Sequence, residues 1–581
     1  MDFEGVYLQE LSRLRTLGQE FAQEQPMVAS YLGGESGDPD VERLLQGVAF
    51  LTALVRKKLD DEVPEFISDV VSLVGTDIVG PLPAMTVLQI EGIGKNPKGV
   101  EIKAGSEFAS QPVDGTSCIF STSWPFTIQP VHLISCATET VGNNGRISLH
   151  LELQNLLLAQ WAGDKLSIYF SGPYPEAANM AYTVLHKLKK VSVRFGADKD
   201  AQSYPLTVQF PGLDPDKSLF PVKAVIAKHL RWARQSQAFP ERGFFIELSG
   251  FNAASKPPGA TEFSIDFDFI YKGQHVNKIS NAHFTLNAVP ACNIFDTTAI
   301  PIQRTGLQEN YLIAPLGFDS DKVQIFDVQK VTGREEGNSI EHEYYPTSSV
   351  FVGANGHSYQ VIAQEGVRQG QINHFLRLPF NDSSIGSFIG ANPKRETLSL
   401  FVRCTNGALA ERIRLGEINL RTPQSPEKVT VTNITVPIGA TRPAIGRDGM
   451  WKVAAHARLN LGAAADTKTL KELLTLYLPE GGEDVGRVVA QRRRVEGIEN
   501  ISLTNDTRLV KGNLYRGSVV TIQLNHSFYP CTGDLYLFAN VLAYVLAGFV
   551  ELNTYVTLRV LDVTNGELYE WSYLLSSKQT I

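Results

Sequence analysis

Residues 39–53 read PDVERLLQGVAFLTA, and residues 58–65 read KLDDEVPE. From the first stretch onward, apolar residues recur every three or four positions, which is the period of one face of an α-helix: Val41, Leu44, Val48, Leu51 and Val55. Asp38 fits the N-cap, and Pro39 fits the first helical position, where its missing N–H costs nothing. The stretch therefore predicts an amphipathic helix that begins near residue 39 and that Pro64 ends or restarts.

The residues before this helix carry the same period. Leu8, Leu11, Leu14, Leu17 and Phe21 recur at helical spacing with charged residues between them, and Pro26 breaks the pattern. A third helix is expected over residues 66–74. We call the ten apolar residues of the first two helices the N-terminal stripe. Since about 80 residues bury little apolar surface alone, we expect the stripe to pack against other chains; an intramolecular three-helix core is the alternative.

Beyond Gly80-Pro81-Leu82-Pro83 the helical period gives way to short β-like runs with turn signals between them. Examples are residues 86–90, 147–151, 191–195, 263–269, 323–328 and 397–402, with one helix expected over 177–189. Near the C-terminus we expect helices over 469–478 and 533–552, and strands 554–560 and 568–574 joined through Asn565-Gly566. Residues 421–427 (RTPQSPE) read as a hinge.

These patterns predict an α+β, multidomain protein. We expect an N-terminal helical region (1–80), a β-rich domain (81–290), a mixed, β-rich middle domain (291–427) and a C-terminal α/β domain (428–581). A chain of 581 residues is too long for one core, since single cores stop growing at roughly 250–300 residues.

Composition excludes several function classes. A net charge of −8 argues against nucleic acid, which requires a basic footprint, and against a polybasic membrane anchor. The five cysteines form no CxxC pair and read as reduced thiols. The N-terminus has no signal-peptide pattern. Residues 535–550 are apolar but shorter than the roughly 20 residues that span a bilayer, so a buried helix is expected and no membrane insertion.

Local signatures of catalysis are missing from the sequence. There is no GxSxG elbow and no GxxxxGK[ST] phosphate loop. Gly92–Gly99 is glycine-rich but lies between two β-like runs, which favours a hairpin loop. His342-Glu343 has no second histidine at zinc spacing, and Arg492-Arg493-Arg494 reads as a solvated or partner-facing patch. We therefore predict no catalytic residue, no metal site and no cofactor.

The stretches quoted first resemble a known family. Residues 39–53 are similar to the DPxVERLLEGFAFLTA segment of the TssF family of type VI secretion baseplate proteins, and residues 58–65 to its KLDDEFPE continuation. Residues 286–295 (LNAVPACNIF) resemble its LNCTPVVNLF, and residues 328–333 (VQKVTG) its VxxVTG. Residues 74–85 depart from the family's LYPHYLxPxPSM, which puts the partner contacts near that bend in doubt.

The resemblance implies a structural, non-enzymatic wedge subunit of a contractile injection machine. Its implied partners are a TssG-like subunit, a second copy of the chain, and TssK-like and TssE-like subunits. The implied location is the cytoplasm, at a baseplate docked to the inner membrane through other subunits. The alternative reading is a β-rich hydrolase or a tail protein of a contractile phage.

Overall fold

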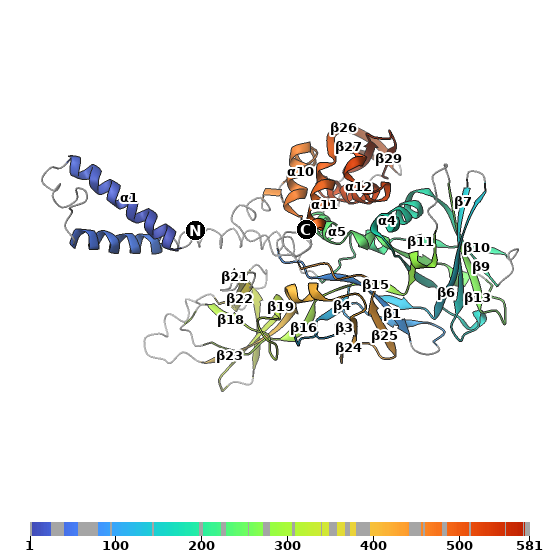
Figure 1. Cartoon of the computed structure of the whole chain (residues 1–581), viewed down its shortest axis with the longest axis horizontal. Helices are drawn as coiled ribbons and strands as arrows, with labels where there is room; N and C mark the ends of the chain where they lie inside the picture. Colours follow the sequence, from blue (N-terminus) through green and yellow to red (C-terminus); the bar gives the residue numbers. More distant parts are fainter. Residues whose placement is uncertain are drawn as a thin grey trace. The chain divides into compact units, whose positions relative to one another are not determined.

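The structure is a computed structural model of the chain, and Figure 1 shows its elements coloured along the sequence. It describes residues 3–24, 40–55, 80–92, 96–141, 144–196, 202–221, 228–253, 255–270, 279–304, 308, 310–337, 340–347, 357–365, 372–378, 395–440, 455–456, 459–478, 485–510, 513–551, 554–572 and 574–575. The chain forms two compact units. Unit 1 holds residues 1–74 and 445–455, and unit 2 holds residues 75–444 and 456–581.

Unit 1 is built on a pair of helices. They are α1 (Phe3–Glu24) and a second helix over residues 40–55. Leu11, Ala49 and Ala53 are buried in this unit, and the two alanines are fully covered. Arg15 of α1 donates hydrogen bonds to Glu42 of the second helix. The two predicted helices are confirmed over these ranges, while the third lies outside the described residues.

A six-stranded sheet forms the centre of unit 2, in the order β24-β3-β4-β15-β1-β25. Its strands are β1 (Met85–Gly92), β3 (Glu107–Ser110), β4 (Ile119–Thr122), β15 (Ala288–Cys292), β24 (Ile418–Arg421) and β25 (Val429–Asn433). The strand β1 pairs antiparallel with both β15 and β25, so segments more than 300 residues apart in sequence are neighbours. One sheet therefore draws strands from three of the four expected domain ranges; the four-domain division stays a prediction.

Three smaller sheets share a hydrophobic core with the six-stranded one. Their orders are β10-β9-β13-β7-β6, β11-β12-β8-β14 and β2-β5, and Figure 1 shows the first beside β11. The strands are β2 (Val100–Ile102), β5 (Phe126–Ile128), β6 (Val131–Val141), β7 (Asn144–Leu153), β8 (Lys165–Phe170), β9 (Leu188–Phe195), β10 (Ser203–Pro205), β11 (Thr207–Gln209), β12 (Phe245–Ser249), β13 (Glu262–Ile270) and β14 (Phe284–Leu286). The β-like runs predicted in this region are confirmed.

A further sheet has its own core. Its order is β16-β23-β19-β20-β21-β22-β18, with β17 paired to β23. The strands are β16 (Phe295–Thr298), β17 (Ile302–Arg304), β18 (Asn310–Ile313), β19 (Gln324–Glu335), β20 (Glu341–Pro346), β21 (Ser358–Glu365), β22 (Ile372–Arg377) and β23 (Glu396–Thr405). The long β19–β23 pair confirms the strands predicted over 323–328 and 397–402.

The C-terminal part of unit 2 combines helices with a sheet in the order β26-β27-β28-β29, with β30 on β28. Its elements are α9 (Leu461–Ala464), α10 (Thr467–Leu476), α11 (Val485–Glu496), β26 (Ile498–Val510), β27 (Asn513–Leu524), α12 (Thr532–Ala547), β28 (Thr554–Asp562), β29 (Leu568–Glu570) and β30 (Leu574–Leu575). The apolar helix α12 is buried against α4 (Tyr174–Tyr182) and α5 (Lys228–Ala238). Among the described helices, none is long and apolar enough to cross a membrane.

Together these sheets and helices confirm the expected α+β, β-rich fold. Three local expectations need correction. The glycine-rich loop 92–99 joins β1 to β2, and these strands lie in different sheets, so it closes no hairpin. The expected hinge at 421–427 is a turn between two strands of one sheet, held where Ser425 and Thr422 donate to the Glu107 carbonyl. Two expected helices end earlier than predicted. The one expected over 177–189 ends before strand β9, which begins at Leu188, and the one expected over 533–552 ends at Ala547, with Gly548 as its C-cap.

Candidate partner interface

Most of the N-terminal stripe lies on the surface of unit 1. Seven of its ten members are between 48% and 69% exposed: Leu8, Leu17, Phe21, Leu44, Val48, Leu51 and Val55. Leu14 and Val41 are half-buried, and Leu11 alone is buried. Large apolar side chains exposed over several helical turns favour an interaction site or a binding groove.

In the described part of unit 1, small side chains are buried and several large apolar side chains are exposed. Ala49 and Ala53 are fully buried, whereas Phe50 and Leu54 beside them are almost half exposed. The stripe as predicted from the sequence does not include Phe50 and Leu54. Their signal was that residues 48–55 are apolar around most of the helix, which exceeds what one partner helix can cover.

Arg15 and Glu42 form an ion pair between the two helices at their surface. The hydrogen bond from Arg15 holds the pKa of the Glu42 carboxyl below its ordinary value. Both side chains are open to solvent, so the pair contributes little free energy and mainly sets how the helices align.

In unit 2 the titratable clusters have structural partners. Glu396 is buried and accepts hydrogen bonds from Tyr344 at 2.9 Å and Arg304 at 3.2 Å. His342 is the histidine that the sequence analysis weighed as a zinc ligand. Its Nε2 atom lies 2.7 Å from Oε1 of the same carboxylate, and its ring centre lies 4.2 Å from that of His357. Burial lowers the pKa of His357. Three side chains of the fold thus surround this carboxylate, and two of them, Tyr344 and Arg304, donate hydrogen bonds to it.

Gly333 explains why the VTG motif ends in glycine. A Cβ atom built on Gly333 would lie 2.0 Å from the Glu396 carboxylate and 2.7 Å from the Tyr344 ring. No side chain larger than hydrogen fits while the buried carboxylate holds its place. Close packing between β19 and β23 therefore requires glycine at the end of this motif.

The basic cluster at 492–494 is divided. Arg492 and Arg493 are exposed, as predicted, but Arg494 donates to the buried Asp534 at 2.8 Å. Tyr174 of α4 donates to the same carboxylate at 2.6 Å, which ties α11, α12 and α4 together. The expectation of three solvated arginines was wrong for Arg494, because a buried carboxylate demands a charged partner.

The motif LNAVPACNIF carries two asparagines that act as internal clamps. Asn293 is fully buried and makes four hydrogen bonds, accepting from Thr405 and Asn406 and donating to Asn406 and Ile119. It thereby joins the six-stranded sheet to strand β23. Asn287 has a φ of 55°, and its side chain accepts from the Gln129 N–H and donates to the Gln129 carbonyl, both at 3.0 Å.

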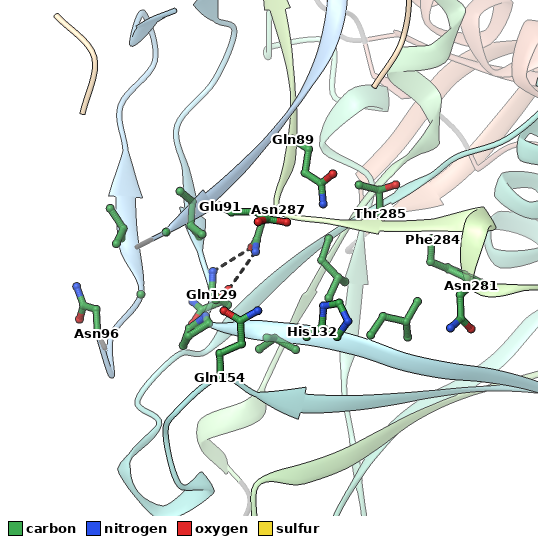
Figure 2. A pocket seen from close by; sticks show the side chains of 18 residues that line it. Gln89, Glu91, Asn96, Gln129, His132, Gln154, Asn281, Phe284, Thr285 and Asn287 are labelled. Carbon is green, nitrogen blue, oxygen red and sulfur yellow. Dashed lines mark hydrogen bonds between the residues drawn. The ribbon is translucent and has the colours of Figure 1, made fainter. Parts of the chain in front are cut away.

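The Asn287–Gln129 pair borders a cavity of about 240 Å³, which Figure 2 shows from close by. Its walls come from β1, β6, β14 and residues Asn96 and Gly99 before β2, and carboxamide side chains line much of it: Gln89, Asn96, Gln129, Gln154, Asn281 and Asn287. Glu91 and His132 complete its polar lining together with Thr285. Sequence reasoning missed this cavity, since its residues come from five separate segments.

The described residues contain no candidate metal site. No group of three or more His, Cys, Asp or Glu side chains among them could hold a metal ion. The five cysteines are unpaired thiols, and burial raises the pKa of Cys292 to about 12, which suppresses its thiolate.

A family model of the type VI secretion system protein TssF matches residues 1–578. The chain belongs to the TssF family. TssF is a baseplate subunit of that secretion system. A curated relative, type VI secretion system component TssF1 of Pseudomonas aeruginosa, is 25% identical over an alignment of 632 residues that covers 97% of each protein.

Two solved structures share the fold. One is a chain of a TssK-TssF-TssG baseplate subcomplex, with a TM-score of 0.76 and 21% identity, covering 92% of this chain and 100% of that one. The other is a chain of a type VI secretion baseplate complex, with a TM-score of 0.64 and 22% identity, covering 97% and 98%. The TssF likeness thus extends over nearly the whole chain.

Proposed function

We propose that this TssF-family chain works as a non-enzymatic wedge component of the baseplate and that the N-terminal stripe is its main docking surface for a TssG-like subunit. The observation that carries the proposal is the exposure of seven large apolar side chains on the two N-terminal helices. Exposing them costs free energy that only a partner recovers, at roughly 25 cal/mol for each Å² of apolar surface covered.

The TssK-TssF-TssG subcomplex supports TssG-like and TssK-like subunits as partners of this chain. A TssE-like subunit and a second copy of the chain belong to the proposal as further partners. Since the stripe continues over both helices, it offers room for more than one partner helix, which fits a bundle formed by several chains. We place this assembly in the cytoplasm, docked at the inner membrane through other subunits.

The non-enzymatic part of the proposal has support in the site chemistry. The buried carboxylates of Glu396 and Asp534 accept hydrogen bonds from internal donors, and burial raises the pKa of the Cys292 thiol. Movement between packed subunits is the work that such a chain can perform. The hydrolase alternative gains no specific observation.

The test replaces two exposed members of the stripe, Leu17→Asp together with Leu51→Asp. The matched control is Thr16→Asp with Thr52→Asp, which adds the same charges one position away on each helix, at side chains that are also exposed. Each purified chain is titrated with the TssG-like subunit, and its folding is checked by thermal unfolding.

We expect the leucine variant to stay folded and to lose at least about 2 kcal/mol of binding free energy, a roughly 30-fold weaker complex. The threonine control should bind within a few-fold of the unaltered chain. Equal binding by a folded leucine variant would contradict the proposed interface.

A further inference from the structure

The carboxamide-lined cavity of Figure 2 has a chemistry that the wedge function does not use. Besides its six carboxamides, its lining holds one carboxylate, Glu91, and among the described lining residues there is no Lys or Arg. An anionic ligand such as a phosphate would therefore meet a carboxylate and no guanidinium or ammonium group. The cavity instead suits neutral groups that both donate and accept hydrogen bonds.

Four of the six carboxamides already make hydrogen bonds. Besides Asn287 and Gln129, Asn96 accepts from the Lys98 N–H at 3.2 Å, and Asn281 donates to the Ile134 carbonyl at 2.8 Å. Asn287 and Gln129 form the rigid border, where Gln129 also accepts from the Trp161 indole at 2.9 Å. Within the part of the chain that the structure describes, the side chains of Gln89 and Gln154 make no hydrogen bond. Figure 2 shows them on opposite sides of the cavity, with His132 beside Gln154.

This fold already shows what a carboxamide recognises in such a place. The Asn287 side chain pairs with one residue's N–H and C=O, the two groups that every extended peptide presents. Asn433 likewise donates to two backbone carbonyls, those of Arg414 and Thr435. Gln89 and Gln154 can offer the same donor and acceptor to a chain that enters from outside.

The size of the cavity limits what enters. A volume of about 240 Å³ is below the roughly 300–1,000 Å³ typical of pockets for drug-sized ligands. It accommodates a short stretch of extended chain. The apolar part of the lining, which includes Ile128, Phe284 and Leu286, covers such a stretch on its non-polar side.

We propose that this cavity binds a short, extended and non-acidic peptide segment of another baseplate subunit, with Gln89 and Gln154 bonding to its peptide groups and Glu91 excluding acidic residues. The proposal rests on the chain's proposed work in a baseplate. It adds a second contact in unit 2, independent of the N-terminal stripe in unit 1.

The first experiment replaces His132 by the photoreactive residue p-benzoylphenylalanine in the full chain, co-expressed with the TssG-like and TssK-like subunits. The control places the same residue at Gln209, an exposed carboxamide on β11. We expect position 132, and not 209, to cross-link to one extended segment of another subunit, identified by mass spectrometry. Cross-links at both positions alike, within the same chain only, or at neither position would overturn the proposal.

The second experiment measures affinity for the subunit so identified. Gln89→Ala with Gln154→Ala should weaken it about tenfold, as the loss of two hydrogen bonds implies, while Gln209→Ala should leave it unchanged. Unchanged affinity in the double variant would contradict the assignment. A second contradicting outcome is a sugar ligand. In that case the neutral saccharide chitobiose would raise the melting temperature of the unaltered chain but not that of the double variant.

The two proposals fail separately. If Leu17→Asp with Leu51→Asp binds its partner normally, the stripe is not the interface, whatever position 132 contacts. If that variant loses binding and position 132 still yields no intersubunit cross-link, the wedge function stands and the cavity proposal falls.

Discussion

The helix pair of unit 1 and the six-stranded sheet of unit 2 use their residues in opposite ways. In the sheet, β1 is buried over Met85–Leu88, and fully buried asparagine and threonine side chains have internal partners. In the helix pair, most of the large apolar residues face solvent, whereas Ala49 and Ala53 are fully buried. The comparison teaches that the sheet buries its apolar surface within this chain, whereas the helix pair leaves apolar surface that we expect a partner chain to cover.

The largest expected effect tests the completeness of the sheet. Asn293→Leu removes four hydrogen bonds and leaves buried donors and acceptors unpaired, which should cost about 3–5 kcal/mol of unfolding free energy. Urea unfolding followed by fluorescence measures it. The control Asn500→Leu, at an exposed position of β26, should change the midpoint little. A small effect at Asn293 would remove the contrast between the two regions.

Acid should weaken unit 2 through His374. Burial lowers the pKa of this side chain on β22 from 6.5 to about 4, so the folded state binds its proton less readily than the unfolded chain. The stability is present above about pH 6.5 and is lost as the pH falls towards 4, by at most about 3 kcal/mol, and less because the residue is only half-buried. His374→Gln should flatten the pH dependence of the urea midpoint over this window. A curve that keeps its slope in the variant would contradict the assignment.

An intermediate effect sharpens the picture of the helix pair. Ala53→Leu adds volume to a fully buried position and should destabilise the pairing of α1 with residues 40–55 by about 1–3 kcal/mol. Faster hydrogen exchange in both helices would show it. Thr52→Leu, one residue earlier and exposed, serves as the control and should exchange as the unaltered chain does.

The smallest expected effect on the free chain belongs to the exposed stripe. Leu44→Ser should change the unfolding free energy by no more than about 0.5 kcal/mol, because Leu44 is 69% exposed. The same variant should weaken binding of the TssG-like subunit, measured by titration, whereas Thr52→Ser should not. A large loss of stability with unchanged binding would reverse the comparison, since Leu44 would then belong to an internal core.

The sequence by itself determined the family and the local elements. The period of Leu8 to Phe21 and of Val41 to Val55 predicts helices because residues three and four apart share a face, and alternation predicts strands such as 263–269 for the same kind of local reason. The motifs at 39–53 and 58–65 carried the resemblance to TssF, which the match over residues 1–578 confirmed.

Only the tertiary structure decided which of these residues are buried and which are exposed. It paired β1 with β25 across more than 300 residues, placed Arg494 against the buried Asp534, and gathered the cavity from five segments. It also separated Leu11, which is buried, from Leu17, which is not, although both share one helical period. The physical reason is that periodicity reports the face of a helix, while burial depends on what lies against that face, and distant parts of the chain supply it.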